Sequence, residues 1–509
     1  MIKKSDVLIV GAGGAGLVAA LKAKESGADV RVITKEYPTR SQTCMAQGGI
    51  NAALGNVGED SVEAHIKNTL KSAHGEADKA MVEFMCSEAI GAVEWLDKIG
   101  VCFSRTQDGK VAQRRLGGAS ASRACYAQDY TGLKILHTLY DRCMAEGIKI
   151  DSEKYLLELI KDDIGVRGAK ILDIRSGDIE VYAAPAVILA GGGYSRIYDK
   201  NSTNSTASTG DTIAVAARAG AKLLGMEFVQ FHPTALKSSS ILIGESARGE
   251  GGYLLNSKGE RFTNELLPRD EVSRAIDAEI KKGEDIFLDI RHLGEKFIDE
   301  GLPQERKLAK LYENVDPVYE LMPIRPVAHY TMGGVEVDKN SKTNIDGLFA
   351  CGECANHKVH GGNRLGGNSL LEIVVFGAEA GKNAALYAQS QDIKEFSEDI
   401  GVSTSKVLED IKKYTNEINF YIKKEELGDI FYENVGIIRD KERLALARDK
   451  VLSMIDQLPL MGVSDTSKVY NTNLVEFLEF KNMLDVALEV VESALNRDVS
   501  CGAHYMAGN

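Results

Sequence analysis

The stretch DVLIVGAGGAG, residues 6–16, decides the fold class of this chain. After Asp6 it has a four-residue apolar run, VLIV, typical of a buried strand, and the run leads into a glycine turn. Residues 17–27 follow with the apolar periodicity of a helix that ends at a glycine, and the run DVRVIT, residues 29–34, predicts a second strand. Strand, glycine turn, helix and strand in this order predict a βαβ unit with parallel strands.

The glycines of this unit indicate a dinucleotide site. Gly11 makes the turn, Gly13 lets the backbone approach a pyrophosphate, and Gly16 lets helix and strand pack closely. A ribose is usually held by an acidic residue about 20 positions further on, but here the second strand ends in Thr34, Lys35 and Glu36. Lys35 therefore either meets a phosphate or ribose oxygen or faces solvent.

Two distant segments favour FAD over a nicotinamide. VILAGGG, residues 187–193, is another buried strand that runs into glycines, and TNIDGLFACGE, residues 343–353, is a third. A nicotinamide domain needs only the first unit, whereas distant strands that each deliver glycine to one face fit an extended dinucleotide. The pattern resembles the two-part signature of FAD proteins, and FAD is the predicted cofactor.

Composition excludes several classes of function. The net charge is −13 and no long basic run occurs, which argues against a nucleic-acid partner. No apolar run approaches the roughly 18 to 20 residues that span a bilayer, so direct membrane insertion is not expected. The start of the chain has no separate apolar stretch of a signal peptide, and the eight cysteines are scattered. We therefore expect a cytoplasmic protein with reduced thiols, with any membrane association made through partner subunits.

The chain contains one CxxC pair, Cys351 and Cys354. There is no second pair, and Gly352 and Glu353 between the two cysteines belong to the predicted flavin segment. We therefore predict no metal site and no iron–sulfur cluster in this chain.

The predicted fold class is α/β, with a Rossmann-like FAD-binding domain, an inserted α+β capping domain and a C-terminal helical domain. The FAD-binding domain is expected over residues 1–225 and 333–390, and the insert over 226–332. From residue 391 the sequence changes to amphipathic helices, expected over residues 406–422 and 441–458.

Cations and imidazoles are concentrated beside glycine and proline in and after the insert. The segments are EFVQFHPTAL, GESARGEGGYL, LPRDEVSRA, RPVAHYTMGG and VHGGNRLGGNSLLE. An arginine presents a planar fork of donors that matches a carboxylate, and an uncharged histidine donates one ring N–H. Together such residues could hold a small dianion at both ends, which predicts a dicarboxylate ligand.

These motifs, together with PTRSQTCMAQGG (residues 38–49) and GLFACGE, resemble the flavoprotein subunit of the succinate dehydrogenase and fumarate reductase family, which includes L-aspartate oxidase. The resemblance runs nearly from end to end. It implies an FAD-dependent oxidoreductase that interconverts fumarate and succinate, with hydride transfer between FAD and the substrate.

The resemblance also implies roles for individual residues. Arg269 matches the proton donor, and Glu245 and Arg248 match the relay that reprotonates it. The residues expected at the substrate are His232, Thr234, His329, Arg364, Gln113 and Leu116. Those expected at FAD are Gly11, Gly13, Gly14, Gly16, Thr34, Lys35, Ser41, Thr43, Gln47, Gly48, Gly49, Ala190, Gly191, Gly192, Asp211, Glu353, Arg364, Ser369 and Leu370.

Two positions depart from the family pattern in an informative way. Leu116 stands where aspartate oxidase has a glutamate and the succinate and fumarate enzymes have phenylalanine; an apolar residue offers an ammonium group no partner, which favours fumarate or succinate. Gln42 stands where membrane-bound members carry the histidine that is covalently linked to the flavin. The resemblance therefore implies noncovalent FAD and, as a hypothesis, a bias toward fumarate reduction.

The partner implied by the resemblance is an iron–sulfur electron-transfer subunit, with further subunits allowed. The tail SCGAHYMAGN, residues 500–509, lacks charges found in longer members, so the surface that meets this partner is expected to differ. Two alternatives remain open from the sequence: L-aspartate oxidase, and a flavin-binding electron-transfer or scaffold subunit without dicarboxylate turnover.

Overall fold

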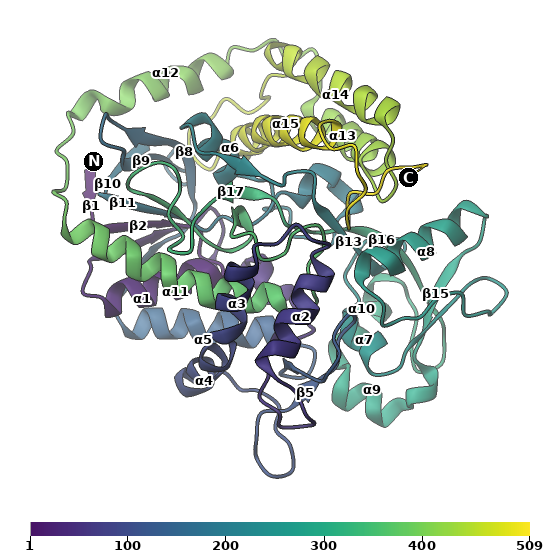
Figure 1. The fold of residues 1–509 in the computed structure, drawn as a ribbon. Helices are drawn as coiled ribbons and strands as arrows, with labels where there is room; N and C mark the ends of the chain where they lie inside the picture. Colours follow the sequence, from purple (N-terminus) through teal and green to yellow (C-terminus); the bar gives the residue numbers. More distant parts are fainter. Residues whose placement is uncertain (1, 509) are drawn as a thin grey trace.

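The computed structural model describes residues 2–508 and contains a five-stranded parallel sheet at its centre (Figure 1). Its strand order is β18-β11-β2-β3-β7. These strands are β2 (Val7–Val10), β3 (Val30–Ile33), β7 (Lys149–Asp151), β11 (Ala186–Leu189) and β18 (Leu348–Ala350), each parallel to its neighbours. The three strands predicted from distant segments therefore lie side by side, as the prediction of an extended dinucleotide site requires.

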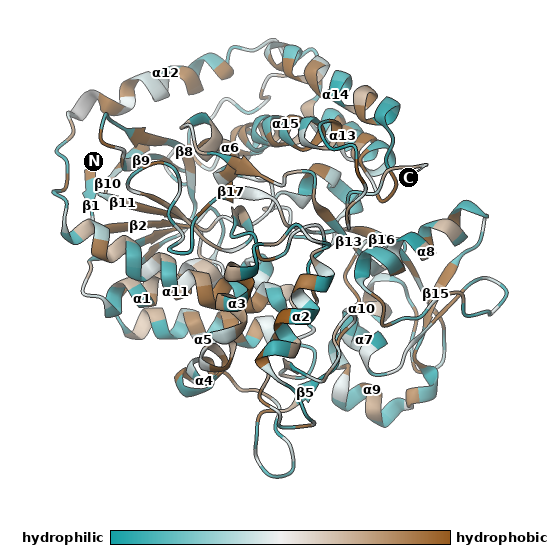
Figure 2. Ribbon diagram, in the orientation of Figure 1, coloured by the Kyte–Doolittle hydropathy of each residue, from teal (hydrophilic) through white to brown (hydrophobic). Residues whose placement is uncertain are grey.

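The middle of the central sheet is buried on both faces, so β2, β11 and β18 are continuously apolar (Figure 2). Val7 and Ile9 of β2 point to one face, where they join the core formed with α1 (Gly14–Glu25), α5 (Thr131–Ala145) and α11 (Asn368–Gln389). Leu8 and Val10 point to the other face, toward the second sheet and the C-terminal helices. This alternation along one strand divides the large core in two.

The glycine turn after β2 is sterically required. Gly11 has a φ of 115°, and a Cβ atom there would lie 2.2 Å from the Ala190 carbonyl oxygen. A Cβ atom on Gly16 would lie 2.0 Å from the Gly11 carbonyl oxygen. Both positions thus need glycine, for the backbone conformation at the first and for close helix packing at the second.

A second, four-stranded sheet of order β1-β10-β9-β8 lies on the face of the central sheet opposite α1. Its strands are β1 (Ile2–Lys4), β8 (Lys154–Lys161), β9 (Val166–Asp173) and β10 (Ile179–Ala183). Smaller elements complete the region: β4 (Ile50–Asn51), α2 (Val62–Ser72), α3 (Lys79–Ser87), α4 (Ala89–Ile99), β5 (Gln113–Arg114), β6 (Ala124–Cys125), α6 (Asp211–Arg218), β12 (Leu223–Leu224), β17 (Gly334–Glu336) and β19 (Ala355–Asn356).

An antiparallel sheet with its own helices projects from this body at the lower right of Figure 1. Its order is β13-β16-β15-β14. The strands are β13 (Val229–Leu236), β14 (Tyr253–Leu255), β15 (Ile286–Asp289) and β16 (Met322–Thr331), with α7 (Glu245–Gly249), α8 (Arg269–Lys281), α9 (Glu295–Gly301) and α10 (Pro303–Tyr312). It has a separate apolar core. All these elements fall within residues 226–332, the range predicted for the inserted domain. The boundaries of that domain remain a prediction.

The C-terminal region consists of α12 (Val402–Ile411), α13 (Phe420–Asn434), α14 (Lys441–Asp456) and α15 (Thr472–Leu495). The expectation of one helix over residues 406–422 was wrong, because α12 ends at Ile411 and α13 begins at Phe420. Asn419 provides the physical reason: its side chain accepts a hydrogen bond from the Tyr421 backbone N–H and caps a new helix. Within residues 2–508, the helices are all too short or too polar to cross a membrane.

Candidate active site

A single cleft collects most of the residues singled out in the sequence. Its volume is about 1650 Å³ including the open mouth, and it extends from the glycine turn after β2 to the start of α7 and α8. The residues predicted at the cofactor all line it except Gly16, which packs against the Gly11 carbonyl instead. The cleft therefore joins the parallel sheet to the antiparallel unit.

The inner part of this cleft fits the predicted dinucleotide. Its backbone wall is made of glycines, and Gly14 donates its N–H to the Thr43 hydroxyl at 3.0 Å. Among residues 2–508, the buried Ser41 Oγ, the Thr212 Oγ1 and both amide atoms of Gln47 lack a hydrogen-bond partner, although all three residues line the cleft. Buried polar atoms without partners are costly, so they indicate a ligand rich in phosphate, hydroxyl and carbonyl groups. The donor set fits FAD.

Lys35 lies at the edge of this part of the cleft and does not face solvent. Its Nζ is 2.7 Å from Asp211 Oδ2 and 2.5 Å from Glu479 Oε1. Burial opposes the charge, but the attraction of Asp211 and Glu479 outweighs it and raises the pKa of Lys35 above its usual value. The alternative of a solvated lysine is therefore wrong.

Two histidines meet at the outer end of the cleft. His232 lies on β13 and His329 on the neighbouring β16, and their rings are 4.8 Å apart. Burial, followed by repulsion from Arg269, lowers the pKa of both rings well below the ordinary value. Both are therefore uncharged near neutral pH, and an uncharged imidazole carries one ring N–H that it can donate. The Nδ1 atoms face Thr234 and Thr203, which leaves the Nε2 atoms for a ligand.

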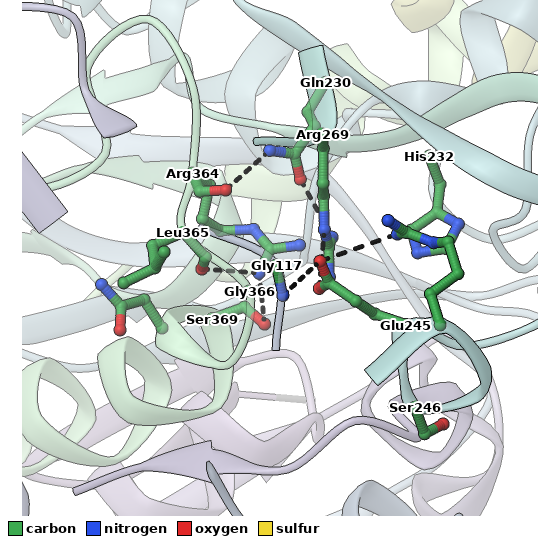
Figure 3. A network of polar contacts seen from close by, with 12 residues as sticks. Gly117, Gln230, His232, Glu245, Ser246, Arg269, Arg364, Leu365, Gly366 and Ser369 are labelled. Atoms are coloured by element: carbon green, nitrogen blue, oxygen red, sulfur yellow. Dashed lines mark hydrogen bonds and ion pairs between the residues drawn. The ribbon is translucent and has the colours of Figure 1, made fainter. Parts of the chain in front are cut away.

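Arg269 and Glu245 form a buried ion pair beside these histidines (Figure 3). Each residue begins a helix, α8 and α7 respectively. The Nε and Nη2 of Arg269 donate to Glu245 Oε2 at 3.1 and 2.6 Å. Glu245 Oε1 accepts the Gly117 N–H at 3.0 Å and lies 3.6 Å from Arg248 Nη2. Burial raises the pKa of Glu245, but the two guanidinium groups outweigh burial and hold it below its usual value.

Arg364 approaches the cleft from the loop before α11. Its Nη1 donates to the Ser369 hydroxyl at 3.2 Å (Figure 3), and its guanidinium carbon lies 4.1 Å from the centre of the Tyr330 ring. Burial, followed by repulsion from Arg269, lowers its pKa to about 10. Three guanidinium groups, of Arg248, Arg269 and Arg364, thus surround the single carboxylate of Glu245, and the excess positive charge suits an anionic ligand.

Several predicted residues lie away from the cleft surface. Gln113 was expected at the substrate, but its amide donates to the Ala52 carbonyl at 2.8 Å and accepts the Asn56 N–H at 3.0 Å. That expectation is corrected: both polar atoms are used by the backbone, and the side chain does not line the cleft. Thr234 and Arg248 lie behind the cleft wall, where they contact His232 and Glu245.

Leu116 and Gln42 do line the cleft. Leu116 is buried against Gly48, where a Cβ atom would be 3.3 Å from Leu116 Cδ1. Gln42 is anchored, because its Oε1 accepts the Ser205 backbone N–H at 2.7 Å.

Three residues that contact the site were not predicted from the sequence. Gln230 accepts from Arg269 Nη1 at 3.1 Å and donates to the Arg364 carbonyl at 2.8 Å. Thr203 contacts His329 Nδ1 at 2.7 Å, and Tyr330 lies under Arg364. The alternation of side chains along a strand could have revealed Gln230, because residues two positions apart point to the same face and Gln230 lies two positions before His232. The contacts of Thr203 depend on tertiary packing alone.

Comparison with known proteins identifies the family. Residues 6–370 match the FAD binding domain family, and residues 424–507 match the fumarate reductase flavoprotein C-terminal family. The chain is 38% identical to the fumarate reductase flavoprotein subunit of Haemophilus influenzae, over 98% of this chain and 88% of that one. It is also 38% identical to the succinate dehydrogenase flavoprotein subunit of Rickettsia bellii, over 98% and 89%. The chain belongs to the succinate dehydrogenase and fumarate reductase flavoprotein family.

Solved structures agree with this assignment. A variant of E. coli quinol fumarate reductase superposes on 100% of this chain and 92% of its own with a TM-score of 0.96 and 37% identity. Adenylylsulfate reductase from Archaeoglobus fulgidus shares the fold, with a TM-score of 0.82, at only 19% identity. Because one fold serves differently named reductases, the chemistry of this FAD-dependent oxidoreductase must be argued from its cleft.

Proposed function

We propose that this chain interconverts fumarate and succinate with noncovalent FAD, and that Arg269 transfers the proton. The observation that carries the proposal is the buried Arg269–Glu245 pair in a cleft that also presents two uncharged histidines and Arg364. The names of the relatives support fumarate and succinate as the substrates, since they include both fumarate reductase and succinate dehydrogenase flavoprotein subunits.

The substrate carboxylates are held in this proposal by Arg364, His232 and His329, with Thr234 supporting His232. Two carboxylates fixed at opposite ends leave the C=C bond between them with no freedom to turn. Charge that develops on a carboxylate during reduction is stabilised by donors already in place, without reorganisation. Bound FAD supplies or accepts the hydride.

The proton is proposed to come from Arg269. A guanidinium group with a pKa above about 12 hardly deprotonates by itself. Glu245 lies 2.6 Å from Arg269 Nη2 and is ionised, so it can accept a proton that originates from solvent and pass it to Arg269 after Arg269 has protonated the substrate. Arg248, 3.6 Å from the other oxygen of Glu245, continues this path away from the substrate.

Gln42 supports noncovalent binding of FAD. A glutamine amide cannot form the imidazolyl bond found in membrane-bound family members, and here the amide oxygen is already used by the Ser205 N–H. A flavin without this bond is expected to have a lower potential and to be a stronger reductant. We therefore propose a bias toward fumarate reduction.

L-aspartate oxidase remains the competing enzyme, and Leu116 argues against it. Leu116 lines the cleft with an apolar surface, which offers no partner to the ammonium group of aspartate. Titration of the oxidised flavin with succinate and with L-aspartate under anaerobic conditions distinguishes the two enzymes. The flavin should be bleached by succinate and not by L-aspartate, whereas bleaching by aspartate would identify the oxidase.

A flavin-binding scaffold or electron-transfer subunit is the competing class outside enzymes. It predicts that fumarate, malonate and oxaloacetate leave the flavin spectrum unchanged. We propose instead that the chain works with an iron–sulfur subunit, through which it can associate with a membrane. Purification of the native assembly and identification of its companion chains tests this, and a flavoprotein isolated alone with full turnover from cellular donors would contradict it.

A further inference from the structure

Arg364 is held in an unusual way for a buried arginine. Within residues 2–508 it makes no ion pair, and its Nε lacks a hydrogen-bond partner. Its contacts are the Ser369 hydroxyl at 3.2 Å, the Leu365 carbonyl at 3.5 Å and the face of the Tyr330 ring at 4.1 Å. The ring face therefore lies against the guanidinium group, which the two hydrogen bonds alone hold only at Nη1.

Tyr330 is itself fixed by a buried carboxylate. Its hydroxyl donates to Glu372 Oε2 at 2.5 Å, and His360 Nε2 lies 2.9 Å from the same oxygen. His357 Nδ1 is 3.6 Å from the other oxygen of Glu372. Tyr330 also belongs to a small apolar cluster with Phe228 and Met332, and Tyr330, Glu372, His360 and His357 are all buried. These contacts hold the hydroxyl end of the Tyr330 ring in place beneath Arg364.

Two side chains that hold Arg364 in place, directly or through Tyr330, lie near the start of one helix. Ser369 and Glu372 are three residues apart in the first two turns of α11, so they lie on the same side of it. Ser369 holds Arg364 directly, whereas Glu372 holds it through Tyr330, which lies on β16 of the antiparallel unit. The position of the guanidinium is thus set jointly by the two parts of the molecule that form the cleft.

We propose that Tyr330, anchored by Glu372, is a positioning residue that orients Arg364 toward the substrate carboxylate without neutralising it. The inference rests on the proposed function. A carboxylate partner would orient Arg364 equally well but would compete with the substrate for its charge. An aromatic face attracts a cation through its quadrupole and carries no net charge, so the full charge stays available. Arg269, which is proposed to exchange a proton, is paired with Glu245 instead.

The test measures oxaloacetate binding to FAD-loaded protein from the change in the flavin spectrum. A desolvated cation–π contact corresponds to about 30-fold in affinity, so Tyr330→Leu should weaken binding by about 10- to 30-fold. Tyr330→Phe keeps the ring but loses the hydroxyl that Glu372 holds, so it should weaken binding by less than Tyr330→Leu does. Tyr194→Phe is the matched control, because the buried Tyr194 hydroxyl donates to the Met226 carbonyl at 2.9 Å and lies outside the cleft lining.

A double-mutant cycle separates positioning from a general structural effect. If Tyr330 acts through Arg364, then Tyr330→Leu should weaken binding by less than threefold in an Arg364→Gln background, which has no cation over the ring. Equal weakening in both backgrounds would overturn the proposal, and so would unchanged binding in Tyr330→Leu. If that variant does not load FAD, Tyr330→Met replaces it, and loss of FAD in both would also overturn the proposal. Absence of any spectral response in the unsubstituted protein would instead contradict the proposed function.

Discussion

Replacement of Arg269 by lysine separates a proton-transfer role from a purely electrostatic one. Lysine keeps the positive charge beside Glu245, so the buried carboxylate is not left unpaired. It loses the planar fork that places two donors 3.1 and 2.6 Å from Glu245 Oε2 and a third 3.1 Å from Gln230 Oε1. A positioned general acid contributes about 10²- to 10⁴-fold to a rate, or about 3 to 5 kcal/mol of the barrier.

We therefore expect Arg269→Lys to lower kcat for fumarate reduction by at least about 100-fold, and Arg269→Ala to abolish it, while FAD remains bound. The assay is fumarate-dependent oxidation of a reduced viologen, with flavin content measured from absorbance. Arg291→Lys is the matched control, because Arg291 also donates through Nε and Nη2 to one carboxylate, at 2.9 Å to each oxygen of Asp289, on the surface of the antiparallel unit. Arg269→Lys with more than about a tenth of the original kcat would refute the proton-transfer role.

Four further predictions address stability, specificity and cofactor binding. Burial and the nearby Asp129 raise the pKa of Glu305 from 4.5 to about 8, so the folded state retains a proton and its stability should fall from about pH 4.5 to 8 by up to a few kcal/mol. Glu305→Gln should flatten this slope in thermal unfolding; an unchanged slope would contradict the assignment. Leu116→Glu should raise KM for fumarate at least about tenfold through repulsion in a buried site, and an unaltered KM would count against its place at the substrate. Gly16→Ala should abolish FAD loading because its Cβ would lie 2.0 Å from the Gly11 carbonyl, whereas Gly91→Ala, with nothing within 4 Å in α4, should add about 0.5 to 1 kcal/mol to the free energy of unfolding. Acid precipitation should release the flavin into the supernatant, and flavin that stays with the pellet would disprove noncovalent binding at Gln42.

The parallel sheet could be predicted because its strands are buried on both faces. VLIV and AVIL are continuously apolar, and VRVI is apolar except for Arg31; all three lie beside glycine or polar turn residues, so local sequence was sufficient for β2, β3 and β11. The C-terminal helices are less certain from sequence, since the apolar periodicity of residues 406–422 continues across a break. Only the cap made by Asn419 shows where α13 begins, and a single capping residue is a weaker signal than a periodic pattern.

In the site, charged residues were easier to find than the residues that support them. Arg269 and Glu245 stand in glycine- or proline-marked segments whose charges have no structural explanation in the sequence. Gln113 stands in such a segment as well, but its amide is used by two backbone groups, and this cannot be known before the loop is folded. Tyr330 reads as an ordinary strand residue next to His329. Its position between Glu372 and Arg364 follows only from the packing of β16 against α11.

The most direct test of the account follows a single turnover without any partner protein. The FAD-loaded chain is reduced by light under anaerobic conditions and then mixed with fumarate, and both the flavin spectrum and the product are measured. The account predicts that fumarate reoxidises the flavin with formation of an equal amount of succinate, that L-aspartate added to the oxidised protein does not reduce it, and that Arg269→Lys slows the reaction at least about 100-fold. Flavin that stays reduced in the presence of fumarate, or that is reoxidised without formation of succinate, would contradict it.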